Sequence, residues 1–343
     1  MSGVKVGVIG MAATIIDKSM PASFSTGRRF DIDEVALAAE VDRLRSEDKC
    51  QVLLLLSHLG LPQDAKLAAN VEGIDVVLSG HTHNRLQHPI QINQTIIIQS
   101  GCHGSFLGRL DLQVGEGDVK CLGHQLIPID DAFDGDPDMQ RIVDTAIEPH
   151  RGEMERIVGE TTIALYRNLQ LHSSMDDLLL LAIATAAGTD VAFSNGWRYG
   201  APIPPGSITV NHLWNMIPTN PPVSVVDMLA SEIRQMMEES LESTFAADPY
   251  RQMGGYLKRF RGLTIYGKIE NPVGHRIERI FFKGRELDDN EEVAVSFVTA
   301  QGVPEKFGQM RRNLSTSAIS ALEHFLAEGP VGEVEGVGRF VTV

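Results

Sequence analysis

The chain has 343 residues, of which 30 are basic and 45 acidic, so its formal net charge at pH 7 is −15 and its pI is about 5.2. A chain of this length exceeds what one hydrophobic core usually organises, which favours two domains. The negative charge would repel a polyanion, so we expect no nucleic-acid partner. No apolar run approaches the roughly 18 residues of a membrane span, so we expect no membrane-spanning helix.

The beginning of the chain and its cysteines bear on its compartment. The first residues, M-S-G-V-K-V-G-V-I-G, lack the basic and long apolar regions of a signal peptide and instead indicate a strand. We therefore expect no export signal in this chain, and its localisation stays open. The three cysteines, Cys50, Cys102 and Cys121, are an odd number without C-x-x-C spacing, which predicts reduced thiols rather than disulfides or a zinc knuckle.

The first 128 residues have the pattern of an α/β domain. Apolar residues at helical spacing predict helices over 33–46 and 64–70, the first with Asp31 or Asp33 as its N-cap. Short and almost continuously apolar runs predict buried strands over 4–9, 51–56, 74–78, 95–99 and 107–114.

The composition changes after residue 128. An acidic, loop-like stretch over 129–137 precedes a polar, helix-compatible stretch over 138–158 that would suit a connector. A second α/β domain follows, with helices predicted near 175–187, 228–243 and 315–327 and a strand over 191–194. The predicted organisation is thus a first domain over 1–128, a loop and linker helix over 129–159, and a second domain over 160–343.

Histidines follow two neighbouring predicted strands of the first domain. His58 stands in S-H-L-G and His81 and His83 stand in S-G-H-T-H, each directly after an apolar run. Ligand sites in α/β sheets cluster beyond the carboxyl ends of strands, so these three imidazoles should share one crevice. Imidazole suits zinc, manganese and iron. A fourth histidine, His103 in G-C-H-G, is expected either to border this crevice or to lie on the surface.

Together, S-H-L-G, G-I-D-V-V-L-S-G-H-T-H and G-S-F-L-G-R-L-D-L resemble the later part of a calcineurin-like metallophosphoesterase domain of the 5′-nucleotidase superfamily. The resemblance implies an α/β (α+β) fold: the C-terminal half of a metallophosphoesterase β-sandwich with flanking helices, followed by a 5′-nucleotidase C-terminal-type substrate domain. It also implies two divalent metal ions (Mn, Zn or Fe). His58 and His81 would bind one ion, and His83 would bind the other.

Three motifs of that superfamily, D-x-H, G-D and G-N-H-E, should precede the first predicted strand and are missing from this chain. They supply the bridging aspartate, further ligands and the catalytic histidine, so we predict an incomplete metal site with no intact catalytic residues. Three explanations fit: a separate chain supplies the missing half, the sequence starts internally, or the protein is a pseudoenzyme. The missing strands would also leave an apolar sheet face and open strand edges exposed.

In the second domain, T-D-V-A-F-S-N-G-W-R-Y-G resembles the substrate loop of 5′-nucleotidases, which implies substrate contacts for Asn195 and an anion-binding role for Arg198. The aromatic form W-R-Y-G looks more like the thiosulfohydrolase branch of the bacterial sulfur-oxidising system. By position, Tyr256 matches one of two rings that hold a nucleobase in the family, and Phe307 is the nearest match to the other. Simple packing is the alternative for both rings.

These observations favour a metal-dependent hydrolase that releases phosphate from nucleotides, a reaction of nucleotide catabolism. One alternative is a thiosulfohydrolase-like enzyme that acts on a sulfur group carried by a partner protein. Another is a non-catalytic remnant that binds a nucleoside or an anion. The expected partners are a small anionic substrate and, under the split-gene explanation, a second chain.

Overall fold

The computed structural model describes residues 3–115, 117–333 and 338–343, and the chain folds as two compact units. The N-terminal unit consists of Met1–Asp134 and Ala247–Gly254, and the C-terminal unit consists of Gly135–Ala246 and Gly255–Val343. In the described ranges no helix has both the length and the apolarity that a membrane crossing requires. The predicted domain limits at 128 and 159 stay predictions.

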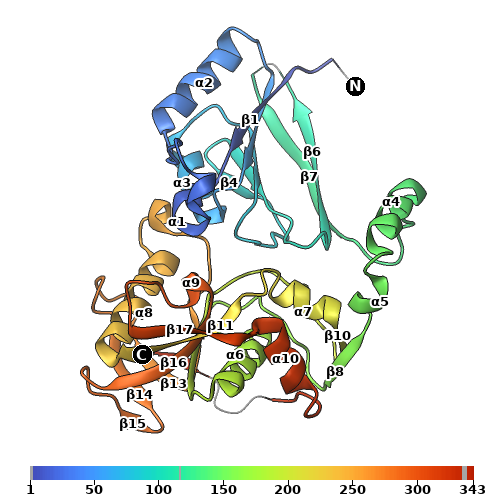
Figure 1. The fold of residues 1–343 in the computed structure, drawn as a ribbon. Helices are drawn as coiled ribbons and strands as arrows, with labels where there is room; N and C mark the ends of the chain where they lie inside the picture. The colour runs from blue at the N-terminus through green and yellow to red at the C-terminus, as the bar shows by residue number, and fades with distance from the viewer. Residues whose placement is uncertain (1–2, 116, 334–337) are drawn as a thin grey trace. The chain divides into compact units, whose positions relative to one another are not determined.

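The N-terminal unit contains a five-stranded sheet and a separate hairpin (Figure 1). Its sheet has the order β1-β2-β3-β5-β4, with parallel pairing except between β4 and β5, and β6 pairs with β7 in the hairpin. Its elements are β1 (Val6–Met11), α1 (Ile16–Ser19), η1 (Ala22–Phe24), α2 (Glu34–Ser46), β2 (Val52–Ser57), α3 (Leu61–Asn70), β3 (Val76–Ser79), β4 (Ile90–Ile92), β5 (Thr95–Ile98), β6 (Phe106–Val114), β7 (Val119–Pro128) and η2 (Pro249–Arg251).

Helices cover one face of this sheet. Leu37 and Val41 of α2 and Leu67 of α3 pack with Leu53 and Leu55 of β2 in one buried cluster. The α2 helix begins as predicted, because the side chain of Asp33 accepts a hydrogen bond from the Ala36 amide at 2.9 Å. Figure 1 shows α2 and α3 on one side of the sheet and the β6–β7 hairpin on the other.

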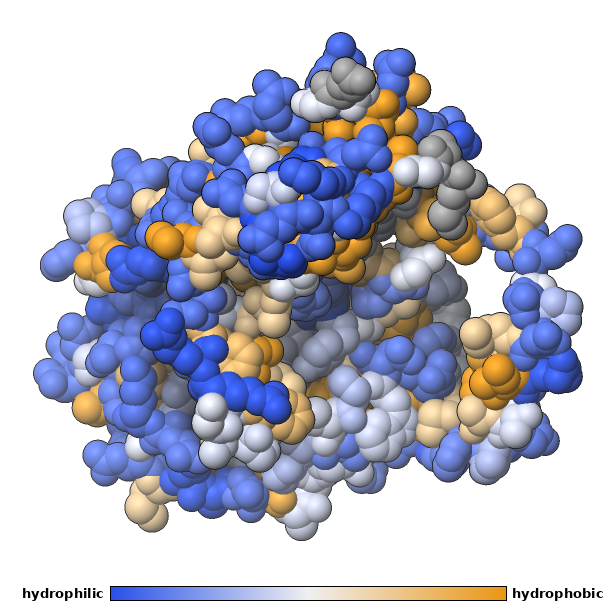
Figure 2. Space-filling model, turned by 90° about the horizontal axis from the view of Figure 1, so that it is seen from above, coloured by the Kyte–Doolittle hydropathy of each residue, from blue (hydrophilic) through white to orange (hydrophobic). Residues whose placement is uncertain are grey.

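The opposite face of the sheet is covered only in part. The hairpin packs Leu110 and Leu112 against Val76 and Ile96. Towards the β1 edge of the same face, Val8 is 55% exposed and Leu56 of β2 is 46% exposed. Figure 2 shows orange, apolar residues among the blue ones in the upper part of its view. Part of this sheet face is therefore exposed, and among the described residues β1 pairs with a strand on one side, β2.

The described residues of the C-terminal unit form three sheets. The main sheet has the order β12-β9-β16-β11-β17, and the others are β15-β14-β13-β18 and β10-β8. The elements are α4 (Pro137–Ile147), α5 (Arg151–Met154), β8 (Ile157–Thr161), α6 (Ser174–Ala187), β9 (Val191–Ser194), β10 (Gly206–Thr209), α7 (Val210–Met216), β11 (Pro222–Leu229), α8 (Ala230–Phe245), β12 (Arg259–Arg261), β13 (Leu263–Gly267), β14 (Ile277–Phe282), β15 (Arg285–Glu286), β16 (Glu292–Val298), α9 (Thr299–Gly302), β17 (Gln309–Ser317), α10 (Ala318–Leu326) and β18 (Arg339–Thr342).

Both faces of the main sheet of this unit are buried. Ala192 of β9 faces a cluster that includes Leu178 of α6 and Leu322 of α10. Its neighbour Phe193 faces a second cluster that includes Met237 of α8 and Ile265 of β13. Successive side chains of a strand point to opposite faces, so a strand buried on both sides reads as a continuous apolar run.

Some predicted boundaries in this unit are wrong. The helix predicted to start near residue 315 begins at Ala318, because β17 continues to Ser317. The Ser317 hydroxyl accepts a hydrogen bond from the Ser320 amide at 3.3 Å and caps the helix. The end of the predicted connector, near residue 157, is the start of β8 instead.

The segment Ala247–Gly254 lies between helix α8 and strand β12 in sequence but belongs to the N-terminal unit. Asp248 forms an ion pair with Lys66 of α3 at 2.8 Å. The Tyr250 hydroxyl donates a hydrogen bond to Glu34 of α2 at 2.5 Å. We call this stretch the crossing segment.

Candidate active site

Three parallel strands of the N-terminal unit end beside the histidines. β2 leads into His58, β3 leads into His81 and His83, and β5 leads into the loop with His103. The ring centroids of His58 and His81 are 5.0 Å apart, and those of His83 and His103 are 5.9 Å apart. The three predicted histidines therefore lie along the carboxyl edge of the sheet, where His103 joins them.

The backbone of these loops is unusual. His81, His83 and His103 have φ values of 69°, 58° and 59°, in the left-handed region that residues other than glycine rarely adopt. Such conformations cost free energy and tend to cluster at functional sites. A Cβ atom at Gly80 would approach the Ser57 carbonyl oxygen to 3.2 Å and Nδ1 of His58 to 3.4 Å, so glycine permits the close approach of the two loops.

A buried carboxylate ties the two strand ends together. Asp64 of α3 accepts hydrogen bonds from the hydroxyls of Ser57 and Ser79, each at 2.5 Å. Burial raises the pKa of Asp64 to about 6, although the two hydroxyl donors oppose this shift. Asp64 thus fixes the residues that precede His58 and His81.

Gln99 organises the G-H-T-H loop from the next strand. Its side-chain amide donates to the Ser79 hydroxyl and to the Gly80 carbonyl, both at 2.8 Å. Its side-chain oxygen accepts from the Asn84 amide and, at 3.3 Å, from the Thr82 hydroxyl. The buried side chain of Gln99 therefore fixes the loop that carries His81 and His83.

The crossing segment contacts the same loop. Nε2 of His81 lies 3.2 Å from the Met253 carbonyl oxygen. A Cβ atom at Gly254, where φ is +68°, would lie 2.5 Å from that Nε2 atom. Glycine therefore lets the crossing segment pass this close to the His81 ring without a steric clash.

The histidines fit the implied pair of metal ions only in part. His58 and His81 offer two imidazoles, whereas catalytic zinc sites usually have three protein ligands. Among the described residues, one group of three potential ligands has its donor atoms within 4.8 Å of one another, and it consists of His83, Cys102 and His103. This group contains no carboxylate that could bridge two ions.

In the C-terminal unit, the predicted substrate loop is held by two polar side chains. Oε1 of Gln301 accepts hydrogen bonds from the Asn195 amide at 3.0 Å and from the Trp197 indole at 3.1 Å. Arg167 donates to the Tyr199 carbonyl oxygen at 2.9 Å. The rings of Trp197 and Tyr199 stack with centroids 5.5 Å apart.

Arg198 and Tyr256 lie close together in the C-terminal unit. The Arg198 guanidinium carbon is 5.9 Å from the Tyr256 ring centroid, and that of Arg259 is 5.2 Å away. The Tyr256 amide donates to the Gly196 carbonyl oxygen at 3.2 Å, and a Cβ atom at Gly196 would lie 2.3 Å from the Tyr256 carbonyl oxygen. Their backbones are therefore in close contact.

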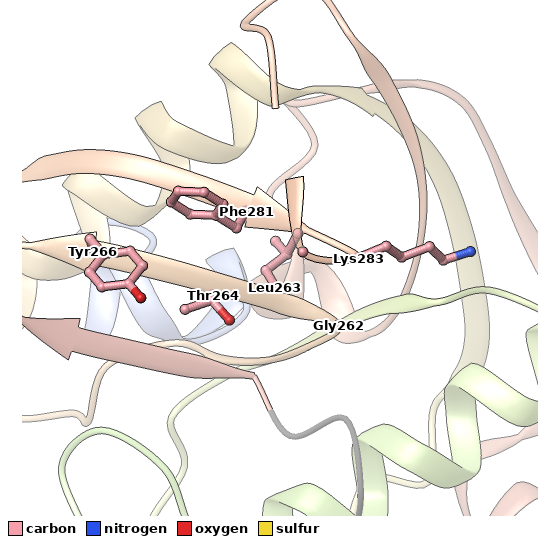
Figure 3. A pocket seen from close by; sticks show the side chains of 7 residues that line it. Gly262, Leu263, Thr264, Tyr266, Phe281 and Lys283 are labelled. Atoms are coloured by element: carbon pink, nitrogen blue, oxygen red, sulfur yellow. The ribbon is translucent and has the colours of Figure 1, made fainter. Parts of the chain in front are cut away.

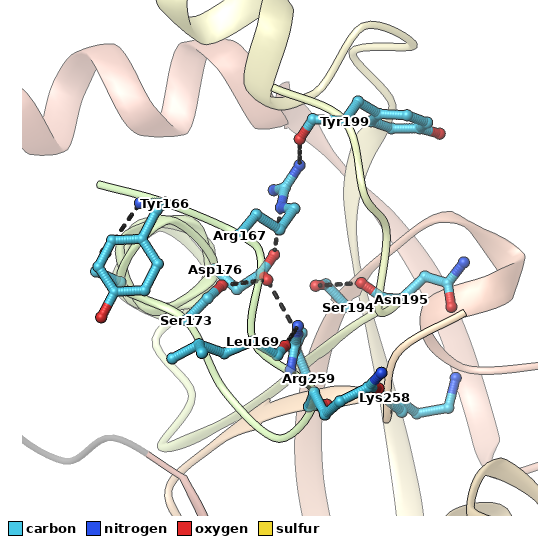
Figure 4. A network of polar contacts seen from close by, with 12 residues as sticks. Tyr166, Arg167, Leu169, Ser173, Asp176, Ser194, Asn195, Tyr199, Lys258 and Arg259 are labelled. Atoms are coloured by element: carbon cyan, nitrogen blue, oxygen red, sulfur yellow. Dashed lines mark hydrogen bonds and ion pairs between the residues drawn. The ribbon is translucent and has the colours of Figure 1, made fainter. Parts of the chain in front are cut away.

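A buried ion network supports this region (Figure 4). Asp176 of α6 accepts from Arg167 at 2.9 Å, from Arg259 at 3.0 Å and from the Ser173 hydroxyl at 2.7 Å. Figure 4 shows Arg167 reaching on to Tyr199 and Arg259 lying beside Leu169. Taking these charges out of water is costly, so removing Asp176 would leave two buried guanidinium groups without their carboxylate.

Two other buried groups of this unit have shifted pKa values. Burial raises the pKa of Asp177 to about 7, with the neighbouring Asp176 adding to the shift. Burial lowers the pKa of Lys258 to about 8, and its ammonium group donates to the Gln301 carbonyl oxygen at 2.5 Å. Lys258 thus contacts the same glutamine that holds the Asn195–Trp197 turn.

Phe307 does not join Arg198 and Tyr256 as a ligand-binding ring. It is 3% exposed and packs in the cluster of Val226, Met237 and Phe297. The structure therefore supports the packing alternative for Phe307, which lies buried in this cluster just before β17.

Each unit also has a surface pocket that lies away from the predicted site residues of that unit. One of about 400 Å³ lies over β13 and β14, where Tyr266, Phe281 and Lys283 line it (Figure 3). The other, of about 850 Å³, lies in the N-terminal unit at the amino ends of the strands, beside Gln51, Asp75 and Thr95. Neither pocket contains a predicted site residue.

Comparisons with known proteins show what the chain is similar to. Residues 153–302 match the family model of the 5′-nucleotidase C-terminal domain. The chain is 25% identical over 316 residues to the trifunctional nucleotide phosphoesterase protein YfkN of Bacillus subtilis strain 168, an alignment that covers 86% of this chain and 20% of that protein.

Two solved structures share the fold. The sulfate thiohydrolase SoxB of Thermus thermophilus superposes with a TM-score of 0.90 at 26% identity, over 99% of this chain and 64% of SoxB. A 5′-nucleotidase precursor, also from Thermus thermophilus, gives a TM-score of 0.82 at 20% identity, over 99% of this chain and 73% of that one. The predicted α/β fold and the predicted superfamily are thus confirmed, while the chain spans only part of these relatives.

Proposed function

We propose, because the chain belongs to the 5′-nucleotidase superfamily, that it is a metal-dependent hydrolase that releases phosphate from nucleotides or related phosphomonoesters. The observation that carries this proposal is the set of imidazoles at the carboxyl edge of one parallel sheet, His58 and His81 as one pair and His83 beside His103. Divalent ions held there would activate water and polarise the ester oxygens.

The residues of each unit have separate roles in this proposal. His58, His81 and His83 would hold metal, and Asp64 would keep the first two in place through Ser57 and Ser79. Arg198 would bind the anionic group of the substrate, and Tyr256 would stack on a base, which is worth about 1–3 kcal/mol. The chain supplies no bridging carboxylate among the described ligand clusters, so we assign it no proton-transfer residue.

Phosphate release from a nucleoside monophosphate in the presence of manganese or zinc tests the proposal. The chain should be assayed alone and together with any polypeptide encoded directly upstream of Met1 that contains D-x-H, G-D and G-N-H-E. Substitution His81→Ala should lower the rate by about 100-fold or more, because losing a ligand costs at least as much as losing an outer-shell partner. His88→Ala, an exposed histidine of the same unit, is the matched control. Full activity in His81→Ala would contradict the proposal.

A second candidate function is the hydrolysis of a carrier-bound sulfur group. The observations that favour it are the stacked rings of Trp197 and Tyr199 in W-R-Y-G and the likeness to SoxB. Sulfate release from a carrier protein that bears a thiosulfonate would support this candidate. Protection of Tyr256 from chemical modification by a nucleoside would instead favour the nucleotidase.

A third candidate is a protein that binds a nucleoside or an anion without catalysis. It follows from the incomplete fit of the histidines to two metal ions. Calorimetry with manganese on the chain alone tests it, and tight binding of two equivalents would contradict it.

A further inference from the structure

The loop after β5 adds two potential ligands that the resemblance does not imply. Cys102 and His103 follow the third parallel strand, and their ligand atoms lie within 4.8 Å of one another and of a ring nitrogen of His83. We propose that His83, Cys102 and His103 bind one zinc ion through a thiolate and two imidazoles.

The chemistry of these three side chains favours zinc. Thiolate sulfur and imidazole nitrogen are its common ligands, whereas manganese and magnesium prefer oxygen. Two imidazoles and one thiolate leave the fourth tetrahedral position open, as in catalytic zinc sites. Binding replaces the thiol proton of Cys102 with the metal and releases that proton to water.

The geometry needs only a small adjustment. Ligand atoms around a tetrahedral zinc ion lie roughly 3.3–3.8 Å apart, given bond lengths of about 2.0–2.3 Å. The imidazoles of His83 and His103 meet at 73°, and His103 is exposed, so its ring can rotate without repacking the core. Both residues have left-handed backbone conformations, which cost free energy. Binding of a metal ion would offset that cost.

This inference deepens the proposed function, because it names the metal ion that His83 would bind. It rests on the proposed function only for the role of that ion in hydrolysis. It also separates the two histidine pairs. His58 and His81 are outside the group of three ligands, so their substitution should leave zinc at Cys102.

The first experiment uses alkylation by iodoacetamide in the full chain after treatment with a chelator. Zinc should suppress the alkylation of Cys102 and leave that of Cys121, an exposed cysteine on β7, unchanged. Mass spectrometry of the two cysteine peptides gives both rates from one sample. Equal rates for Cys102 with and without zinc would overturn the inference.

The second experiment uses calorimetry with zinc and absorption spectroscopy with cobalt(II), which shows a thiolate charge-transfer band only when sulfur is a ligand. Cys102→Ser should abolish the band. Cys102→Ser and His103→Gln should each weaken zinc binding by about 100-fold or more. The control variants Cys121→Ser and His88→Gln should bind zinc as the parent does. A thiolate band that persists in Cys102→Ser would overturn the inference.

The failure of this inference and that of the proposed function are distinguishable. Protection of Cys102 and a thiolate band without any hydrolysis would support the zinc site and count against the hydrolase. Hydrolysis that depends on His81, with no protection of Cys102, would support the hydrolase and overturn the zinc site.

Discussion

The two units of the chain differ in how completely their sheets are buried. The main sheet of the C-terminal unit has apolar clusters on both faces, with Ala192 in one cluster and Phe193 in the other. The sheet of the N-terminal unit is covered by helices on one face, while Val8 and Leu56 on the other are about half exposed. The comparison shows that strand pairing and the hydrogen bonds of Asp64 hold the strand ends before His58 and His81 in place, although part of the neighbouring sheet face is exposed.

The largest expected effect concerns the buried ion network of the C-terminal unit. Substitution Asp176→Ala would leave Arg167 and Arg259 as unpaired buried charges and should lower the free energy of unfolding by about 3–5 kcal/mol. Both tryptophans, Trp197 and Trp214, are in this unit, so their fluorescence in a urea titration reports its unfolding.

The control for Asp176 is Glu239→Ala, which breaks an exposed ion pair with Lys306 and should cost about 0–1 kcal/mol. If Asp176→Ala lowered the free energy of unfolding no more than this control does, the buried ion network would not contribute to the stability of the C-terminal unit.

Two neighbours on β2 compare the covered and bare faces of the N-terminal sheet. Leu55 is fully buried, so Leu55→Ala should lower the free energy of unfolding by about 2–5 kcal/mol. Leu56→Ala should cost about 1 kcal/mol or less, because Leu56 is 46% exposed. Hydrogen exchange of the β2 peptide measures both. Equal losses would mean that the bare face is covered in solution.

Asp64 makes the stability of the N-terminal unit depend on pH. Its folded-state pKa of about 6 exceeds the ordinary value of 3.8, so the folded state binds the proton more tightly than the unfolded state. The stabilisation is complete below pH 3.8 and is lost as the pH rises through 6, a loss of up to ~3 kcal/mol.

Asp64→Asn should remove this pH dependence while keeping an oxygen that accepts a hydrogen bond from Ser57 or Ser79. Hydrogen exchange of β2 and β3 between pH 4 and pH 7 tests it. The same slope in the parent and the variant would show that another group titrates there.

The smallest expected effect concerns the contact of the crossing segment with His81. Gly254→Ala would add a left-handed alanine, at about 1 kcal/mol, and push its Cβ atom against the His81 ring. Gly274→Ala carries the same backbone strain, since φ there is +82°, but its Cβ atom would enter open space. Gly254→Ala should therefore lower the melting temperature more than Gly274→Ala does. The reverse order would mean that the His81 ring can move away from the added Cβ atom without loss of stability.

Much of the fold follows from the sequence because its strands are apolar runs with clear ends. The predicted strand over 191–194 is β9, and the predicted N-cap Asp33 precedes α2. Strand β17 escapes prediction because its sequence, Q-M-R-R-N-L-S-T-S, is polar and only partly buried, so neither periodicity nor hydrophobicity marks it. Tertiary pairing with β11 determines its conformation.

The site can be predicted wherever a histidine follows a recognisable strand. The same rule applied to the strand predicted over 95–99 would direct attention to Cys102 and His103, which follow β5 as His81 follows β3. Phe307 matches a family position only by its distance along the chain, and its burial in the core cannot be read from that spacing. Side-chain partners such as Gln301 lie more than one hundred residues from Asn195 and leave no local pattern.

The crossing segment has a consequence for how such proteins can be divided or recombined. The chain passes between its units three times, after Asp134, Ala246 and Gly254, so neither unit is one continuous piece of the gene. A fragment that ended at Asp134 would lose the Met253 carbonyl beside His81 and the partner of Lys66. Exchange of whole units between relatives therefore requires two matched cuts in the second half of the gene, and a swap at one junction would separate His81 from the segment that it contacts.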